Sequence, residues 1–204
     1  MISEQDRLER QIRFVLEIDK LKEIRRRSYL LTSHRRENSS EHSWHIAVMA
    51  MVLAEHGPQD LDLFRVLAML LVHDLVEIDA GDTYCYDQAG AKDKAEREEG
   101  AAERIFGLLP QDQNQWLKAL WEEFEAGQTP EARFAHAVDR LMPLLHNYHT
   151  QGRSWLEHAI TRDEVRDRMA PVHKGSKALG KLAWEIIDQA VAKGYLRPNG
   201  GSPD

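Results

Sequence analysis

The stretch Ala68-Met-Leu-Leu-Val-His-Asp-Leu-Val-Glu-Ile-Asp-Ala-Gly-Asp82 decides the fold, because an apolar run ends within it in His73, Asp74 and further acids. Residues 66–72 are all apolar, which fits a buried strand or a helix buried on every side. Leu, Met and Ala dominate the run, and about twenty residues here contain no Pro or Gly, so we expect a helix. A buried carboxylate needs a cation or hydrogen bonds, and a bound metal would satisfy His73 and Asp74 together.

The composition fits one soluble globular domain. With 204 residues, 42% of them hydrophobic and 30% charged, the chain can bury a sizeable core. We expect one helical domain over residues 1–195 and a disordered tail over residues 196–204. The formal net charge of -7, with no long basic run to offset it, argues against a nucleic-acid polymer as partner.

The compartment is inferred from what the sequence lacks. Cys85 is the one cysteine, so no internal disulfide is expected and a reducing compartment fits. No signal-peptide pattern and no apolar span of about twenty residues occur. We therefore expect a cytoplasmic protein with no membrane partner.

The rest of the chain predicts an all-α fold with no convincing strand. Helix boundaries are set by capping residues, Pro and Gly. Helices are expected from Ser3 to about Ile24, from Ser39 or Ser40 to Glu55, from Asp60 or Asp62 to about Ile78, from Lys92 to Leu109, from Asp112 to Gly127, after Thr129, after Thr161 and from Ser176 to Lys193. The basic segment from Arg25 to Asn38 is expected to be an irregular connection.

Three groups of residues stand out against this helical pattern. His42 and His45 lie one turn apart at the start of the second helix, His73 and Asp74 end the apolar run, and Asp139 lies beside an apolar stripe. Each has an ordinary alternative: a surface histidine, a hydrogen-bonded core pair, or a salt bridge between Asp139 and a neighbouring arginine. Together they supply the nitrogen and oxygen ligands of a mixed metal site.

The order of these motifs resembles a known family. The segments Glu37-Asn-Ser-Ser-Glu-His-Ser43, His73-Asp74 with Glu77, Gly81-Asp82 and Ala137-Val-Asp139 are similar to the H…HD…D signature of the HD-domain superfamily of metal-dependent phosphohydrolases. They resemble most closely the branch with the bacterial 5′-deoxynucleotidases and HD domain-containing protein 2. The resemblance covers roughly residues 24–145. It implies an HD-domain helical bundle with a metal site between core helices.

The resemblance also implies roles for individual residues. The metal ligands would be His42, His73, Asp74 and Asp139, holding one divalent ion, and their ligand types leave Mn, Co, Fe, Ni, Zn or Mg open. Glu77 would position or activate the attacking water, and Asp82 would lie near the leaving group. The alternatives are a solvated helix-end acid for Glu77 and a turn residue for Asp82.

Substrate contacts follow from the same resemblance. Arg27 falls where relatives have a phosphate-binding arginine, Arg36 is a second candidate, and both have the alternative of a solvated basic loop. His45 is interpreted as a residue on the substrate side or in the core.

Position 28 departs from the family pattern. Deoxynucleotidases have a tryptophan there that helps to exclude a ribose 2′-hydroxyl, whereas this chain has Ser28. Ser28 therefore leaves room for ribonucleotides, unless Tyr29 or Trp44 supplies the missing bulk.

The expected function is that of a metal-dependent phosphomonoesterase. It would release phosphate from nucleoside 5′-monophosphates, as a 5′-nucleotidase does, through a metal-activated water. Alternatives are an HD hydrolase acting on a cyclic nucleotide, a nucleoside triphosphate or an alarmone, and a non-enzymatic helical protein with a structural metal. Relatives form dimers, so a homodimer is expected. A core of this size is also not expected to need all of Trp116, Trp121, Trp155 and Trp184.

Overall fold

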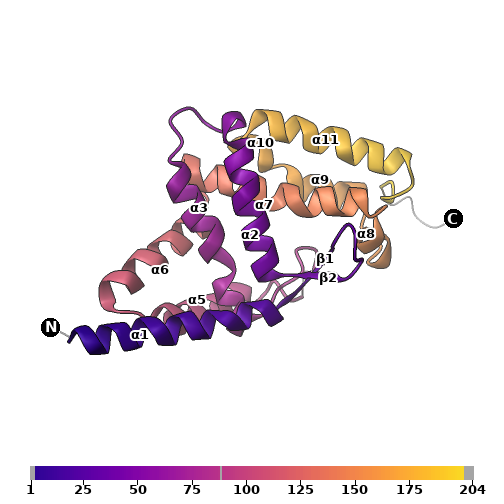
Figure 1. The fold of residues 1–204 in the computed structure, drawn as a ribbon. Coiled ribbons are helices and arrows are strands. Elements are labelled where there is room, and N and C mark those ends of the chain that lie inside the picture. The colour runs from indigo at the N-terminus through magenta and orange to yellow at the C-terminus, as the bar shows by residue number, and fades with distance from the viewer. Residues whose placement is uncertain (1–2, 88, 200–204) are drawn as a thin grey trace.

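The computed structural model describes residues 3–87 and 89–199, which fold into helices and one small sheet (Figure 1). In chain order the elements are α1 (Glu4–Glu17), η1 (Ile18–Glu23), β1 (Arg25–Tyr29), β2 (Arg36–Asn38), α2 (Ser39–Leu53), η2 (Ala54–His56), α3 (Leu63–Val72), η3 (His73–Val76), α4 (Glu77–Ala80), α5 (Lys94–Phe106), α6 (Gln111–Ala126), α7 (Pro130–His149), α8 (Arg153–Glu157), α9 (Arg162–Met169), α10 (Val172–Gly175) and α11 (Lys177–Ala192), where η denotes a 3₁₀ helix. The predicted all-α class is confirmed for most of this chain.

Helix α7 is the centre of the larger core. It packs against α2, α3, α6, α10 and α11, and Figure 1 shows it crossing the molecule below α11. The helix begins as expected, with Thr129 as its N-cap and Pro130 at its first position. Its buried face includes Phe134, Val138 and Leu141, which belong to one continuous apolar cluster.

A second apolar cluster joins the N-terminal helix to the middle of the chain. Phe14 of α1 and Leu21 of η1 pack with Val76, Ile105 and Phe106. In Figure 1, α1 runs along the base of the molecule beside α5. This cluster supports the segment around η3 from below.

The apolar run of the opening stretch is helical, as predicted, but the helix does not continue to Ile78. Asp62 caps α3 by accepting from the backbone N–H of Arg65 at 3.0 Å. The chain then tightens into η3, which contains His73 and Asp74, before α4 begins. A 3₁₀ turn rotates successive side chains by a larger angle than an α-turn, which changes the direction of the two polar side chains.

Two boundary predictions are wrong. The N-cap of α2 is Asn38, one residue before the expected serines, and it forms a capping box with Glu41. The segment expected to be irregular is a β-hairpin, in which Arg25 pairs with Asn38 and Tyr29 with Arg36. The strand β1 reads Arg-Arg-Arg-Ser-Tyr and lacks the apolar alternation by which a strand is predicted from sequence. Backbone pairing and polar contacts stabilise it instead.

The predicted tail begins too early. Leu196 is buried, and Arg197 forms an isolated bridge with Thr161. An apolar residue after the last helix completes the core there, and the Pro- and Gly-rich composition that follows concealed this. The remainder of the predicted tail, 200–204, lies outside the described residues.

The burial of the tryptophans does not support the expectation of a dimer, which assumed that the core would not need all four of them. Trp121 and Trp155 are buried, and Trp184 is partly buried against the larger core. Of the four tryptophans, Trp116 alone is largely exposed. The small core therefore does use most of these side chains.

No helix in the described ranges combines the length and the hydropathy that a bilayer span requires.

Candidate active site

A pocket of about 240 Å³ opens where the β-hairpin, the η3–α4 segment, α7 and α9 meet. One water molecule needs roughly 10–15 Å³, so the pocket can admit a small-molecule ligand. Its walls come from the five segments 26–28, 73–86, 94–98, 124–147 and 154–169. Both carboxylates and guanidinium groups line it.

Two histidines and an aspartate converge beside this pocket from three separate helical segments. Nε2 of His42 lies 2.9 Å from Oδ1 of Asp139, and Nε2 of His73 lies 3.8 Å from the same oxygen. One ligand atom from each of the three residues lies within 4.8 Å of the others. His42 and His73 are buried, so the two nitrogen ligands are shielded from solvent.

The far nitrogen of each imidazole faces a neighbouring acceptor. Nδ1 of His73 lies 2.9 Å from the backbone carbonyl of Leu70, one turn earlier, so Nε2 is directed towards Asp74 and Asp139. Nδ1 of His42 lies 3.6 Å from Oε2 of Glu37. The contact with Leu70 fixes the orientation of the His73 ring, as such partners do in metal-binding histidines, whereas the distance from His42 to Glu37 exceeds that of a hydrogen bond.

The two carboxylate oxygens of Asp74 face different partners, a histidine and an arginine. Its Oδ1 lies 3.0 Å from Nε2 of His73, and its Oδ2 accepts a hydrogen bond of 2.7 Å from Nη1 of Arg26. The same guanidinium lies 3.8 Å from Oε1 of Glu77. Arg26 therefore compensates two buried carboxylates at one edge of the pocket.

Glu77 and Asp82 face the same space. The hydroxyl of Ser39 donates to Oε2 of Glu77 at 2.6 Å, which fixes the carboxylate. Burial raises the pKa of Glu77 well above its usual value, and the charge of Asp74 adds to the effect. Burial also raises the pKa of Asp82. Both acids therefore hold protons at a higher pH than exposed carboxylates do.

The charges of the convergent group are strongly coupled. Burial opposes charge on His73, but the Asp74 carboxylate raises the pKa of that imidazole to about 9. Burial likewise disfavours ionised Asp139, yet the hydrogen bond and charge of His42 hold its pKa well below the usual range. Without a metal, the group is an ion-pair network of imidazolium and carboxylate.

The substrate residues expected from the sequence divide into two sets. Arg27 and Ser28 line the pocket. Arg36 does not, because its guanidinium lies over the ring of Tyr29 at 5.6 Å and 4.0 Å from Oε2 of Glu157. His45 also lies outside the pocket, because its ring is directed towards His146.

Neither residue proposed to replace the missing tryptophan lines the pocket. Tyr29 is buried, and its hydroxyl donates to Glu157 at 2.8 Å. Trp44 is exposed on the outer face of α2. The aromatic side chains that do line the pocket are Tyr84, Tyr86, Phe124 and Trp155.

Several site residues could not be predicted from the sequence. Arg26 lies in the basic segment and Ser39 in the motif that contains His42, but no spacing rule connects them to Asp74 and Glu77. Arg140 and Arg168 line the pocket, and Nη1 of Arg140 is buried without a hydrogen-bond partner among the described residues. Burial and the charge of Arg168 lower the pKa of Arg140, as expected for two cations that share one space.

The donor set fits a divalent metal. Two imidazole nitrogens and a carboxylate oxygen converge, and Nε2 of His73 is a buried nitrogen without a hydrogen bond. Asp74 can add a further oxygen from Oδ1, which lies beside His73. Imidazole and carboxylate ligands together suit Mn, Fe, Co, Ni or Zn.

Three comparisons relate this arrangement to known proteins. The chain is 33% identical to the 5′-deoxynucleotidase HDDC2 of Homo sapiens over 135 residues, which are 66% of this chain; it spans 65% of the length of that curated relative. It is 53% identical to a structure described as a predicted metal-dependent phosphohydrolase from Magnetospirillum magnetotacticum MS-1, with a TM-score of 0.92, and the match covers 97% of this chain and all of the other. The PH0347 protein of Pyrococcus horikoshii OT3 shares the fold, with a TM-score of 0.61 at 24% identity over 89% of this chain and 99% of that chain.

The family assignment rests on most of the chain. The family model for the HD domain matches residues 18–179, which include the hairpin, the convergent histidines and α7. The motifs that first suggested this resemblance, including His73-Asp74 and Asp139, all lie within the matched range. The chain therefore belongs to the HD domain family.

Proposed function

We propose that the protein is a metal-dependent phosphomonoesterase that releases phosphate from nucleoside 5′-monophosphates. The observation that carries the proposal is the convergence of His42, His73 and Asp139 beside a pocket that also contains arginines. Such a site combines metal ligands with cations suited to a phosphate group. The names of the human relative and of the Magnetospirillum structure support the same chemistry.

The metal ligands in this proposal are His42, His73, Asp74 and Asp139. They would hold a divalent ion, which when bound would lower the pKa of water and offset the negative charge of the phosphate. Buried ligands with oriented rings keep the site ready for the ion. The ion is Mn, Co, Fe, Ni, Zn or Mg, and the imidazoles favour the transition metals.

Two acids move protons in the proposed reaction. The oxygen of water bonds to phosphorus while the bond from phosphorus to the 5′-oxygen breaks. Glu77, oriented by Ser39, positions the attacking water and would accept its proton once the positive charge of a bound ion offsets the burial and the Asp74 charge that raise the pKa of this carboxyl. Asp82, whose raised pKa favours the protonated form, donates a proton to the leaving 5′-oxygen.

The phosphate is bound by arginines that have no carboxylate partner. Within residues 3–87 and 89–199, Arg27, Arg140 and Arg168 line the pocket and form no ion pair within 4.0 Å. Arg26, by contrast, is already paired with Asp74. We therefore assign phosphate binding to the first three and the support of Asp74 to Arg26.

We also propose a homodimer that forms through the outer faces of α2 and α3. Trp44 is 65% exposed and Phe64 is 71% exposed, and the apolar residues Met51, Val52 and Leu71 are exposed on the same two helices. These helices pack side by side, so their exposed residues can form one surface. Sedimentation of the wild type as a 23.5 kDa monomer would contradict the dimer, and Phe64→Ser should shift a dimer towards monomer.

The test of the activity is phosphate release from a panel of ribo- and deoxyribonucleoside 5′-monophosphates. Chelator-stripped protein is assayed with Mn, Co, Mg or Zn, alongside His73→Ala, Asp139→Ala and the control His149→Ala on the exposed end of α7. We expect turnover by the wild type and control only. Full activity in folded His73→Ala and Asp139→Ala, or no turnover across the panel, would refute the proposal.

A further inference from the structure

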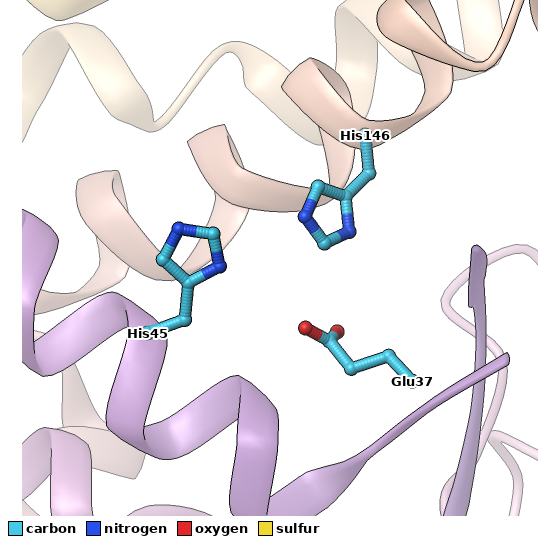
Figure 2. Close-up of side chains that lie close together, drawn as sticks. All are labelled: Glu37, His45 and His146. Atoms are coloured by element: carbon cyan, nitrogen blue, oxygen red, sulfur yellow. The ribbon is translucent and has the colours of Figure 1, made fainter. Parts of the chain in front are cut away.

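A second group of potential metal ligands lies outside the pocket. It consists of Glu37 on β2, His45 on α2 and His146 near the end of α7 (Figure 2). One ligand atom from each of these residues lies within 4.8 Å of the others. Figure 2 shows the two imidazoles and the carboxylate directed towards a common space. None of the three lines the pocket of the candidate active site.

The burial of this group calls for a cation. Glu37 is only 1% exposed and His146 only 4%. Oε2 of Glu37 and Nδ1 of His146 have no hydrogen-bond partner among the described residues. The nearest guanidinium nitrogen, Nε of Arg26, lies 3.9 Å from Oε2, beyond hydrogen-bond distance. Burying a carboxylate oxygen without a hydrogen bond costs free energy unless a cation binds to it.

The two histidine rings are not stacked on each other. The rings of His45 and His146 are tilted by 46°, with centroids 5.7 Å apart. Burial lowers the pKa of His146, which favours the neutral imidazole that binds metals. His45 is partly exposed, so an ion has a route from solvent.

The spacing fits a small transition-metal ion after a modest closure. Tetrahedral coordination at about 2.1 Å places ligand atoms about 3.4 Å apart, and since these atoms lie within 4.8 Å of one another, no pair would need to close by more than about 1.4 Å. Two imidazoles and one carboxylate leave a fourth position for water. This ligand set favours zinc, cobalt or nickel over magnesium or calcium.

We propose that Glu37, His45 and His146 form a second divalent metal site, which binds Zn(II), Co(II) or Ni(II) in preference to Mg(II) or Ca(II). The site ties the hairpin to α2 and α7, because each of these elements contributes one ligand. It also adjoins the first group, since Oε2 of Glu37 lies 3.6 Å from Nδ1 of His42. The second site does not require that the first group be catalytic.

The experiment measures zinc bound per chain after chelator-stripped protein is dialysed against Zn(II) and analysed by mass spectrometry. We expect two equivalents in the wild type and in the control His149→Ala. His45→Ala and His146→Ala should each lose one equivalent. His73→Ala should lose the other equivalent and keep the second site. Because His45 is only partly buried, His45→Ala also serves as the test if His146→Ala fails to fold.

The two proposals fail in different ways. One equivalent in the wild type that is lost in His73→Ala but retained in folded His45→Ala would overturn the second site. One equivalent that is lost in His45→Ala but retained in His73→Ala would support the second site while contradicting the first. The absorption spectrum of bound Co(II) adds a check. Loss of the absorption band of tetrahedral Co(II) in His45→Ala supports the second site, and an unchanged band in His45→Ala overturns it.

Discussion

Nη1 of Arg26 donates to Oδ2 of Asp74 at 2.7 Å, joining the hairpin to the first turn after the apolar helix. The same side chain lies within 4.0 Å of Glu77 and Glu37. One guanidinium therefore neutralises part of the charge of three buried carboxylates. Its loss would leave Asp74 and Glu37 with only imidazoles nearby, and Glu77 with only the hydroxyl of Ser39.

Replacing Arg26 by Ala should strongly destabilise the metal-free protein. Removing one partner of a buried ion pair leaves an uncompensated charge and costs about 3–5 kcal/mol. Arg25 is exposed on the same strand, so Arg25→Ala is the matched control and should change stability by less than about 0.5 kcal/mol. The measurement is urea unfolding of both variants, with and without Mn(II).

Added metal should restore part of the stability lost in Arg26→Ala, because an ion at the first group supplies positive charge to Asp74. The result that would contradict this view is a loss below about 1 kcal/mol in Arg26→Ala. An equal loss in Arg25→Ala would show that the hairpin, and not the ion pair, is responsible.

Metal binding at the first group should strengthen as the pH rises. The raised pKa of His73, about 9, means that its imidazole carries a proton at neutral pH that a metal must displace. Affinity should therefore rise about tenfold per pH unit and level off above about pH 9. Chelator competition with Mn(II) in a His45→Ala background measures this at the first group alone. An affinity that is constant between pH 6.5 and 8.5 would exclude a protonated His73.

The raised pKa of His73 has the opposite effect on the stability of the metal-free protein: its contribution to the free energy of unfolding should fall as the pH rises. A group whose pKa is higher when folded stabilises fully below its unfolded pKa, about 6.5 for histidine. For His73 this contribution should be lost as the pH rises from about 6.5 through about 9. Urea unfolding of the wild-type and His73→Gln proteins across this pH range measures the difference in their free energies of unfolding. This difference isolates the contribution of His73 and should shrink with rising pH.

Local signals were enough to predict most helices, and the site required more. Asp62, Thr129 and Thr161 cap their helices because a cap depends only on the next few residues. The meeting of His42 with Asp139, 97 positions apart, was expected only through the family resemblance. Spacing alone cannot place residues from separate helices together.

The residues that were missed share one physical reason. An arginine next to an aspartate, as Arg140 is, has the sequence pattern of a surface ion pair, and its burial depends on tertiary packing. The hairpin has no apolar alternation, because its polar side chains, such as Arg26, contact the site. Sequence patterns report burial of apolar faces, so strands and cations that serve a polar site are hard to predict.

Position 28 should control the choice between ribose and deoxyribose. Ser28 is a small side chain in the pocket wall, and neither Tyr29 nor Trp44 fills the space beside it. We expect the wild type to hydrolyse both kinds of nucleotide. Ser28→Trp should lower kcat/KM for ribonucleotides at least about tenfold more than for deoxyribonucleotides.

The control for this substitution is Tyr29→Phe, which removes the hydrogen bond to Glu157 outside the pocket and should leave the ratio unchanged. The comparison is made on paired substrates, such as AMP and dAMP, under one metal. If Ser28→Trp is folded and active but leaves the ratio unchanged, position 28 does not contact the sugar.

Arg140 and Arg168 should contribute more to phosphate binding than to the stability of the fold. Arg140 and Arg168 repel each other across the pocket, and an anionic group between them would relieve the repulsion. A charge-assisted hydrogen bond contributes about 1.5–3 kcal/mol, so Arg168→Ala should lower kcat/KM about 10- to 150-fold, with little loss of stability. Arg166→Ala is the matched control on the same helix, since its guanidinium lies over Trp184 at 5.0 Å. Steady-state kinetics and inhibition by inorganic phosphate compare the two variants, and equal effects would show that Arg168 acts through α9 and not through the phosphate.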